Sequence, residues 1–172
     1  IKIINDIDNS FLLNKEKIFL EIGSGKVVLG FYFFSIFKQL IGVEIMENLY
    51  LKSGLIKEKV QNFEENCIKN EMKFFNCDIF DYNISNVDLI FANSTCWTSD
   101  FLGKLKFKVN SEGKKGLIVI NTDQDIFDDR DVKDLEGIKR NKGLLENWVF
   151  YPKIKIDSNW GYSYLYISTK IN

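Results

Sequence analysis

Two short apolar segments of this sequence end in a carboxylate, and a glycine-containing turn follows the first of them. Glu21 precedes Gly23-Ser24-Gly25, and Glu44 closes the second segment. Glycines allow a backbone to turn sharply and to approach a ligand closely. A carboxylate at the end of the next strand can accept both hydroxyls of a ribose. The pattern favours a ligand that contains a nucleoside, although an ordinary strand-to-helix turn and dinucleotide binding both remain open.

Two further polar residues follow the next two apolar segments. Asp78 lies where its carboxylate could accept an adenine amino group while Ile79 or Phe80 covers the ring. Asn93 ends the fourth apolar segment, four residues before Trp97. Ligands of open α/β sheets bind at the carboxyl ends of the strands. We therefore expect these polar residues and the two earlier carboxylates along one rim of a sheet.

The elements that would position these residues alternate between apolar runs and helical patterns, which predicts a mainly parallel sheet in a single domain spanning residues 1–172. Expected strands cover residues 17–22, 39–44, 72–76, 87–92, 116–121, 145–156 and 162–168. Expected helices cover residues 26–38, 48–70 and 98–109, the second being amphipathic, with Leu51 and Leu55 at helical spacing. Pro152 predicts an edge position or a bulge in the penultimate strand.

The composition excludes several kinds of site. The formal net charge of −1 argues against a general nucleic-acid-binding surface. The chain has no histidine, which excludes Ser-His and Cys-His nucleophiles, histidine bases and histidine metal sites. Three cysteines without Cys-x-x-Cys spacing indicate neither a disulfide framework nor zinc, and favour a reducing intracellular compartment. No apolar run is long enough for a membrane span.

The aspartates between residues 123 and 134 suggest a calcium loop. They lack the glycine and the terminal glutamate of an EF-hand. A solvated acidic loop without a metal is therefore expected.

The segments described above occur in the order used by class I S-adenosylmethionine (SAM)-dependent methyltransferases, and the chain resembles that family over residues 17–169. It is most similar to the non-SET histone-lysine methyltransferases of the disruptor-of-telomeric-silencing type and their protist relatives. The more specific segments are Phe-Ala-Asn-Ser-Thr-Cys-Trp (residues 91–97) and the C-terminal Trp160-Gly161. The resemblance implies a Rossmann-like α/β fold with a seven-stranded, mostly parallel sheet, an antiparallel last strand and helices on both faces.

The resemblance also implies a cofactor and a reaction, the transfer of a methyl group from SAM to a protein lysine, for instance in a histone. Asn93 would lie next to the incoming nitrogen, and Trp97 would help to build an apolar channel that favours the neutral amine. Trp148 is expected in the core instead. The residues implied in cofactor binding are Glu21, Gly23, Ser24, Gly25, Glu44, Asp78, Ile79 and Asn93.

Three departures from the family pattern bear on this interpretation. Gly25 runs directly into Lys26, so either the glycine turn is short or a segment is missing there, in which case a chain break is expected. Few residues precede the first strand, and no basic tail is present for DNA. A nicotinamide-dependent oxidoreductase and a catalytically inactive binding domain therefore stay open beside an active methyltransferase.

Overall fold

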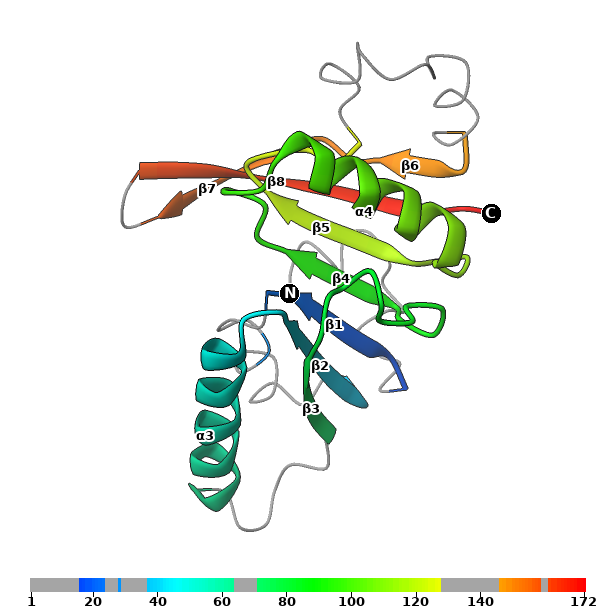
Figure 1. Ribbon diagram of the computed structural model, residues 1–172. Helices are drawn as coiled ribbons and strands as arrows, with labels where there is room; N and C mark the ends of the chain where they lie inside the picture. Colours follow the sequence, from blue (N-terminus) through cyan, green and yellow to red (C-terminus); the bar gives the residue numbers. More distant parts are fainter. Residues whose placement is uncertain (1–15, 24–27, 29–36, 64–70, 128–145, 159–160) are drawn as a thin grey trace. The chain divides into compact units, whose positions relative to one another are not determined.

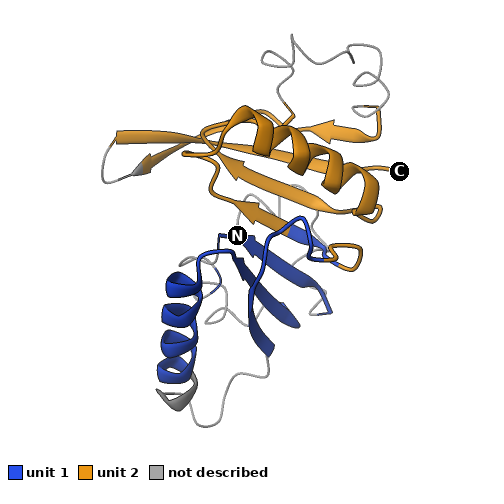
Figure 2. Ribbon diagram, viewed as in Figure 1, with its two compact units in different colours: residues 1–82, 87–89 blue, residues 83–86, 90–172 orange. Residues whose placement is uncertain are grey.

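The computed structural model describes residues 16–23, 28, 37–63, 71–127, 146–158 and 161–172. The chain forms two compact units, which Figure 2 shows in different colours. Unit 1 comprises residues 1–82 and 87–89, and unit 2 comprises residues 83–86 and 90–172. The helix expected over residues 26–38 lies outside the described residues apart from its positions 28, 37 and 38, and so do Ser24, Gly25 and Trp160.

Unit 1 is built on three parallel strands. β1 (Ile18–Ile22) pairs with β2 (Gln39–Glu44), which pairs with β3 (Glu71–Asn76) on its other side. β1 and β2 are almost entirely buried, which explains why their sequences are nearly continuous apolar runs. The pairing begins level across the three strands, so their carboxyl ends lie at one edge. All three strands are predicted by the sequence, β2 with the same bounds.

The helix of unit 1, α3 (Glu47–Phe63), begins directly after β2 and packs against β2 and β3 (Figure 1). The prediction of a helix here is confirmed, but the two leucines that suggested its apolar side do not face the strands. Leu51 and Leu55 are exposed, whereas Ser53 between them is buried. A small side chain thus lies on the packed side of the helix, and the leucines fall on the opposite side.

Unit 2 contains most of the remaining elements. These are β4 (Leu89–Ala92), whose first residue belongs to unit 1, α4 (Ser99–Glu112), β5 (Ile118–Thr122), β6 (Trp148–Phe150), β7 (Ile154–Ser158) and β8 (Gly161–Lys170). β8 runs antiparallel to β5, which confirms the expected antiparallel last strand. Within the described residues, no helix is long and apolar enough to cross a membrane.

Pro152 interrupts the segment of residues 145–156, which the sequence predicts to be a single strand. Phe150 of β6 pairs with Ser168, and Ile154 of β7 pairs with Leu165, so three residues on one side oppose two on β8. One extra residue in a pair is a β-bulge, and proline suits it because proline has no N–H to donate to a ladder. Both parts pair with β8 at the end of the strand order, which confirms the predicted edge position and bulge.

Hydrogen-bonded neighbours follow the order β3-β2-β1-β4-β5-β8-β6, with β7 also on β8. This mostly parallel order with an antiparallel strand confirms the predicted Rossmann-like α/β class. The predicted number of strands is wrong, because the sheet has eight strands rather than seven. The additional strand arises where Pro152 divides the penultimate one.

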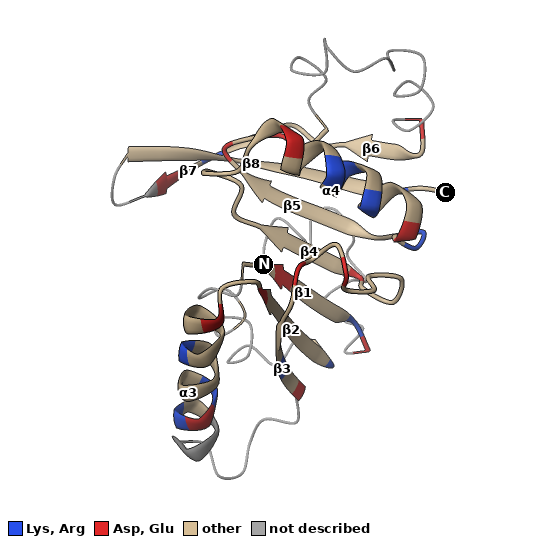
Figure 3. Cartoon of the chain, viewed as in Figure 1, with Lys and Arg blue, Asp and Glu red and all other residues tan. Residues whose placement is uncertain are grey.

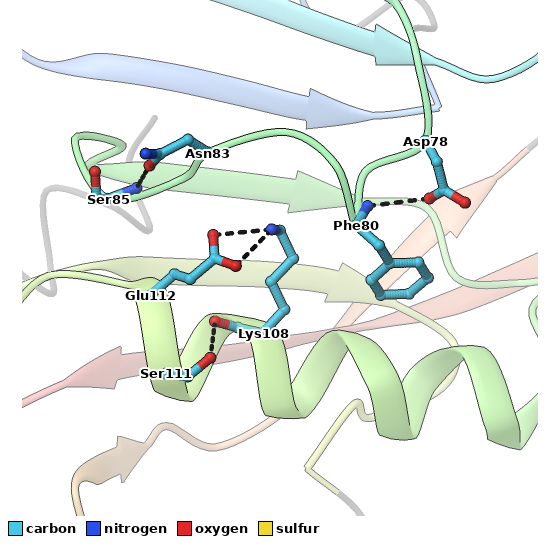
Figure 4. A network of polar contacts seen from close by, with 7 residues as sticks. All are labelled: Asp78, Phe80, Asn83, Ser85, Lys108, Ser111 and Glu112. Carbon is cyan, nitrogen blue, oxygen red and sulfur yellow. Dashed lines mark hydrogen bonds and ion pairs between the residues drawn. The ribbon is translucent and has the colours of Figure 1, made fainter.

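Side-chain hydrogen bonds fix both ends of α4. The hydroxyl of Thr98 accepts a hydrogen bond from the Phe101 backbone N–H at 3.3 Å, which caps the first turn. Near the other end, the Lys108 ammonium lies 2.8 Å from both carboxylate oxygens of Glu112 (Figure 4). This pair extends the helix one turn beyond the predicted end.

Trp148 lies in the core, as expected. Its ring centroid is 4.7 Å from that of Phe127, and its indole N–H donates to the Asn110 side chain at 3.1 Å. A buried indole requires such a partner for its N–H. The contact holds β6 against the last turns of α4.

Lys170, on β8, satisfies two carbonyl groups at the end of α4. Its ammonium donates to the backbone oxygens of Asn110 and Gly113 at 2.6 Å each, and the residue is only 8% exposed. The last carbonyls of a helix have no partners within the helix. A buried cation at this end also interacts favourably with the helix dipole.

We expect Lys170→Met to lower the free energy of unfolding by about 1–3 kcal/mol, because two buried carbonyls lose a charged donor. Chemical denaturation measures the effect. Lys104→Met is the matched control, since that lysine forms an exposed pair with Asp100 within the same helix and should change stability by about 0.5 kcal/mol or less. Equal effects of the two substitutions would contradict the assigned role of Lys170.

Candidate functional site

The glycine turn after β1 begins with a residue whose conformation requires glycine. Gly23 has φ +77°, and its N–H donates to the Val43 carbonyl of β2 at 2.8 Å. A side chain added at Gly23 would meet no atom of the described residues within 4 Å. The backbone angle, rather than crowding by these residues, therefore accounts for glycine, and the described residues leave the space beside it open.

Glu21 closes the same turn from inside the protein. The residue is buried, and one of its carboxylate oxygens accepts a hydrogen bond from the Val28 backbone N–H at 2.9 Å. A buried carboxylate must be hydrogen-bonded to offset the loss of hydration. Glu21 thus links the end of β1 to the chain beyond the turn, and its predicted contact with a cofactor stays a prediction.

Glu44 ends β2 and is only 7% exposed. One carboxylate oxygen accepts the Met46 backbone N–H at 2.9 Å, and the other has no hydrogen-bond partner among the described residues. Asn76, at the end of β3, donates its side-chain amide to the backbone oxygens of Glu44 and Ile45 at 2.9 and 3.2 Å. The Met46 N–H therefore fixes the carboxylate and Asn76 fixes the backbone that carries it, while one carboxylate oxygen stays without a partner among the described residues.

Asp78 follows β3 in a turn that its own side chain stabilises. One carboxylate oxygen accepts the Phe80 backbone N–H at 3.0 Å, as Figure 4 shows. Ile79 is buried at 4% exposure, whereas Phe80 is half-buried. Of the two side chains expected over an adenine ring, Phe80 is the more accessible, and contact with either remains a prediction.

Cys77 lies between these residues and is a poor nucleophile. Burial and the nearby carboxylates of Asp81 and Asp78 raise the pKa of its thiol. Because the thiolate is the reactive form, a raised pKa disfavours reaction at neutral pH. Within the described residues, no group of three or more Cys, Asp or Glu side chains could hold a metal ion.

The carboxyl ends of β1 and β2 both carry acidic residues, as the red positions in Figure 3 show. Unit 1 thus brings Glu21, Gly23, Glu44 and Asp78 to the same edge of its three strands. Three of these residues carry carboxylates that can accept hydrogen bonds, and the fourth, Gly23, has open space beside it among the described residues.

In unit 2, a polar network surrounds Asn93. The oxygen assigned to its amide lies 2.7 Å from the Thr95 hydroxyl and 2.8 Å from the Thr122 hydroxyl. The Thr95 hydroxyl also lies 2.6 Å from a carboxylate oxygen of Asp123. Asn93 is exposed while its amide is held from one side.

Asp123 follows β5 in a backbone conformation that non-glycine residues rarely adopt, with φ 61°. Its N–H donates to the Tyr164 carbonyl at 2.9 Å, and its carboxylate accepts the Tyr164 N–H at 3.4 Å. The hydrogen bond from Thr95 holds the pKa of the Asp123 carboxyl below its usual range, while burial acts in the opposite direction and Ser163 and Tyr164 contribute less.

Buried polar groups support this network from below. The Ser94 hydroxyl is fully buried and contacts the backbone oxygens of Thr122 and Gln124, the latter at 3.0 Å. The Asn121 side chain also donates to the Gln124 oxygen. The loops after β4 and β5 are thereby tied together, which holds Asn93 near Asp123.

Trp97 precedes the first turn of α4 and is half-buried. The centroid of its ring lies 4.6 Å from that of Phe101, and the backbone N–H of Trp97 donates to the Ser94 carbonyl at 3.1 Å. The side chain anchors the start of the helix, and its predicted part in a substrate channel stays a prediction.

The sequence does not predict Thr95, Thr122 or Asp123 as site residues. Thr95 lies within the segment of residues 91–97, but a threonine there has no distinctive signal. Asp123 was grouped with the acidic run that follows it, most of which lies outside the described residues. Its positive φ, which a sequence does not reveal for aspartate, sets it apart.

The chain has the fold of methyltransferases of known structure. It is similar to an RNA methyltransferase from Salinibacter ruber crystallised with S-adenosyl-L-homocysteine (14% identity, TM-score 0.61, 99% of this chain and 92% of that one). It also resembles the N-methyltransferase NodS from Bradyrhizobium japonicum WM9 (12% identity, TM-score 0.59, 99% of this chain and 96% of that one). A third similar structure is that of magnesium protoporphyrin IX methyltransferase from Synechocystis PCC 6803 with bound SAM (10% identity, TM-score 0.62, 98% of this chain and 78% of that one).

No family model matches the sequence, and no curated protein matches it either. The likeness therefore establishes the methyltransferase fold. It does not establish a relationship to the histone-lysine methyltransferases in particular.

The network predicts a pH-dependent contribution of Thr95 to stability. A lowered pKa in the folded state means that the Asp123 carboxylate contributes stability above the pKa of the unfolded chain, and that this contribution is lost as pH falls through the folded value. We expect Thr95→Val to destabilise the protein near neutral pH and to have a smaller effect in acid. Denaturation of both proteins across this pH range measures it; a difference independent of pH would contradict the assignment.

Proposed function

We propose that this chain is a SAM-dependent methyltransferase. The observation that carries the proposal is the Glu44 carboxylate at a strand end, with one oxygen held by a backbone N–H and the other without a hydrogen-bond partner among the described residues. A free oxygen on a carboxylate of a largely buried residue gains from a donor that satisfies it. The two hydroxyls of a ribose are suitable donors. The fold of the chain supports the same cofactor class, because structures with this fold contain SAM or S-adenosyl-L-homocysteine.

The other residues of unit 1 fit the remaining parts of this cofactor. Asp78 retains a carboxylate oxygen that has no hydrogen-bond donor among the described residues and is suited to an adenine amino group, and Phe80 is accessible beside it. Gly23 offers its open side, as far as the described residues show, to the methionine portion. Ser24 and Gly25 lie outside the described residues, and their contact with that portion stays a prediction. When bound, SAM supplies a methyl group on a positively charged sulfur atom. The protein residues orient the cofactor and need not react covalently, because positioning alone lowers such barriers substantially.

The acceptor in this proposal is a nitrogen nucleophile, held by Asn93 and covered by Trp97. The resemblance of the sequence favours the Nζ atom of a protein lysine. An apolar surface such as the Trp97 ring disfavours the ammonium form and thereby favours the neutral amine that can attack.

An RNA base is the second candidate acceptor, favoured by a specific observation on the β7–β8 hairpin. Lys153 lies 4.4 Å from the ring centroid of Tyr164, and Lys155 lies 4.2 Å from that of Tyr162. Exposed lysines interleaved with aromatic rings are a common way to hold single-stranded nucleic acid. Tyr164 is also hydrogen-bonded to Asp123, so this surface adjoins the Asn93 network.

Transfer of a labelled methyl group from SAM tests the acceptor class. Histone and other lysine-bearing peptides form one arm, and short single-stranded RNAs form the other. Label on lysine Nζ supports the first acceptor, and label on a base supports the second. Absence of transfer to either, with SAM bound, would favour the inactive binding domain.

Isothermal titration calorimetry with SAM, S-adenosyl-L-homocysteine and NAD tests the cofactor. We expect Glu44→Gln to weaken SAM binding roughly 10- to 100-fold, because an amide donor replaces an oxygen that accepts from the ribose. Glu71→Gln is the control, since Glu71 lies at the opposite end of β3 and is exposed. Binding of NAD alone, or SAM binding that Glu44→Gln leaves unchanged, would refute the proposal.

A further inference from the structure

Three polar atoms form a short row in unit 2. If the Asn93 amide has its oxygen toward Thr95, this row has too few hydrogens for its two short contacts. The atom assigned as the Asn93 amide oxygen, the Thr95 hydroxyl oxygen and an Asp123 carboxylate oxygen are separated by 2.7 and 2.6 Å. Contacts this short between oxygen atoms each need a hydrogen between them. A threonine hydroxyl carries a single hydrogen and can supply only one of the two contacts.

The proton of Thr95 belongs to the contact with Asp123. Aspartate is ionised at neutral pH, and a carboxylate is a stronger acceptor than a neutral amide oxygen. The 2.7 Å contact between Asn93 and Thr95 must then be supplied from the asparagine. Only its Nδ2 atom carries hydrogens.

We propose that Asp123, acting through Thr95, orients the Asn93 amide with its nitrogen toward the two threonines and its oxygen outward. The two ends of an asparagine amide have nearly the same shape, so hydrogen bonding decides between them. Thr122 accepts either orientation at 2.8 Å because a hydroxyl both donates and accepts. The orientation loses only the contact with the Thr95 backbone N–H, which at 3.5 Å is at the outer limit of a hydrogen bond.

Two further observations support this arrangement. The other end of the Asn93 amide has no hydrogen-bond partner among the described residues and belongs to an exposed residue, so an outward oxygen is free to accept. Asp123 is fixed by its positive φ and by two hydrogen bonds with the Tyr164 backbone, so its carboxylate is held in place opposite Thr95. Such strained backbone conformations often occur at functional sites.

The consequence rests on the proposed function. An outward amide oxygen accepts a hydrogen bond from an N–H of the acceptor, which favours nitrogen nucleophiles that carry a hydrogen. Asn93 would contact the acceptor, whereas Thr95 and Asp123 are positioning residues that act through it.

Nuclear magnetic resonance of the Asn93 side-chain amide tests the orientation without any need for activity. In the unaltered protein, we expect the two amide hydrogens to exchange with water at least tenfold more slowly than those of Asn86, which is exposed. Thr95→Val and Asp123→Asn should both accelerate the exchange. The first removes the hydroxyl that accepts from the Asn93 amide. The second replaces the carboxylate by an amide that can donate to the Thr95 hydroxyl, so that this hydroxyl no longer needs the Asn93 amide as its donor. Thr95→Ser retains the hydroxyl and should preserve the slow exchange.

Fast exchange in the unaltered protein, or slow exchange that neither Thr95→Val nor Asp123→Asn changes, would overturn the inference. With an acceptor identified, the two variants should lower kcat about 10- to 100-fold and leave the Kd for SAM unchanged, while Thr95→Ser restores kcat. Slow exchange in a protein that transfers no methyl group would refute the proposed function and leave the amide orientation standing. An unchanged kcat in active variants would refute the positioning role.

Discussion

The level, parallel pairing of β1, β2 and β3 is the constraint on which the candidate cofactor site depends. Ile18 pairs with Gln39, which pairs with Glu71, so the three strands finish at the same edge. A slip of one residue would turn every side chain of a strand to the opposite face. The pairing therefore determines both which residues are buried and where Glu44 emerges. Hydrogen bonds from Gly23 to β2 and from Asn76 to the turn after β2 extend this alignment beyond the strands.

A different constraint positions Asn93 in unit 2. The loops after β4 and β5 are joined through buried polar groups, with Ser94 and Asn121 both directed to backbone oxygens of the second loop. Buried polar groups of this kind are stable only when satisfied, and a satisfied network specifies one conformation. The β5–β8 pairing adds Tyr164 to the same region, because that residue lies opposite Asp123. The position of Asn93 thus depends on hydrogen bonds that connect three separate parts of the sequence.

Much of the fold could be predicted from the sequence, because its strong signals are local. β2 has the predicted bounds, since its apolar run ends in a charged residue and a helix start follows. Thr98 begins α4 because a threonine hydroxyl can cap a first turn. The side of α3 that packs against the strands could not be predicted, because Leu51 and Leu55 lie on the exposed side. Helical spacing identifies a helix but not the side that packs when a small residue such as Ser53 provides the contact.

The candidate site shows the same division. Residues with a strand-end position, such as Glu44 and Asp78, could be found from spacing, whereas Asp123 could not. Its importance comes from a backbone angle and from contacts with Thr95 and Tyr164, which lie far from it in the sequence. A sequence pattern carries no direct record of such long-range pairs. The network therefore could not be predicted from the sequence, whereas the Asn93 segment that it supports could be.

Three carboxylates of the two candidate sites share the same local arrangement. Glu44, Asp78 and Asp123 each accept a backbone N–H on one oxygen, from Met46, Phe80 and Tyr164 respectively. A backbone donor to one oxygen fixes the plane of a carboxylate. The second oxygen then has a defined direction before any ligand arrives, so little reorganisation is needed on binding. In Asp123 that second oxygen engages Thr95, whereas in Glu44 it has no partner among the described residues. The same local device thus serves to orient a neighbouring side chain in unit 2 and, in the proposed function, to receive a ligand in unit 1.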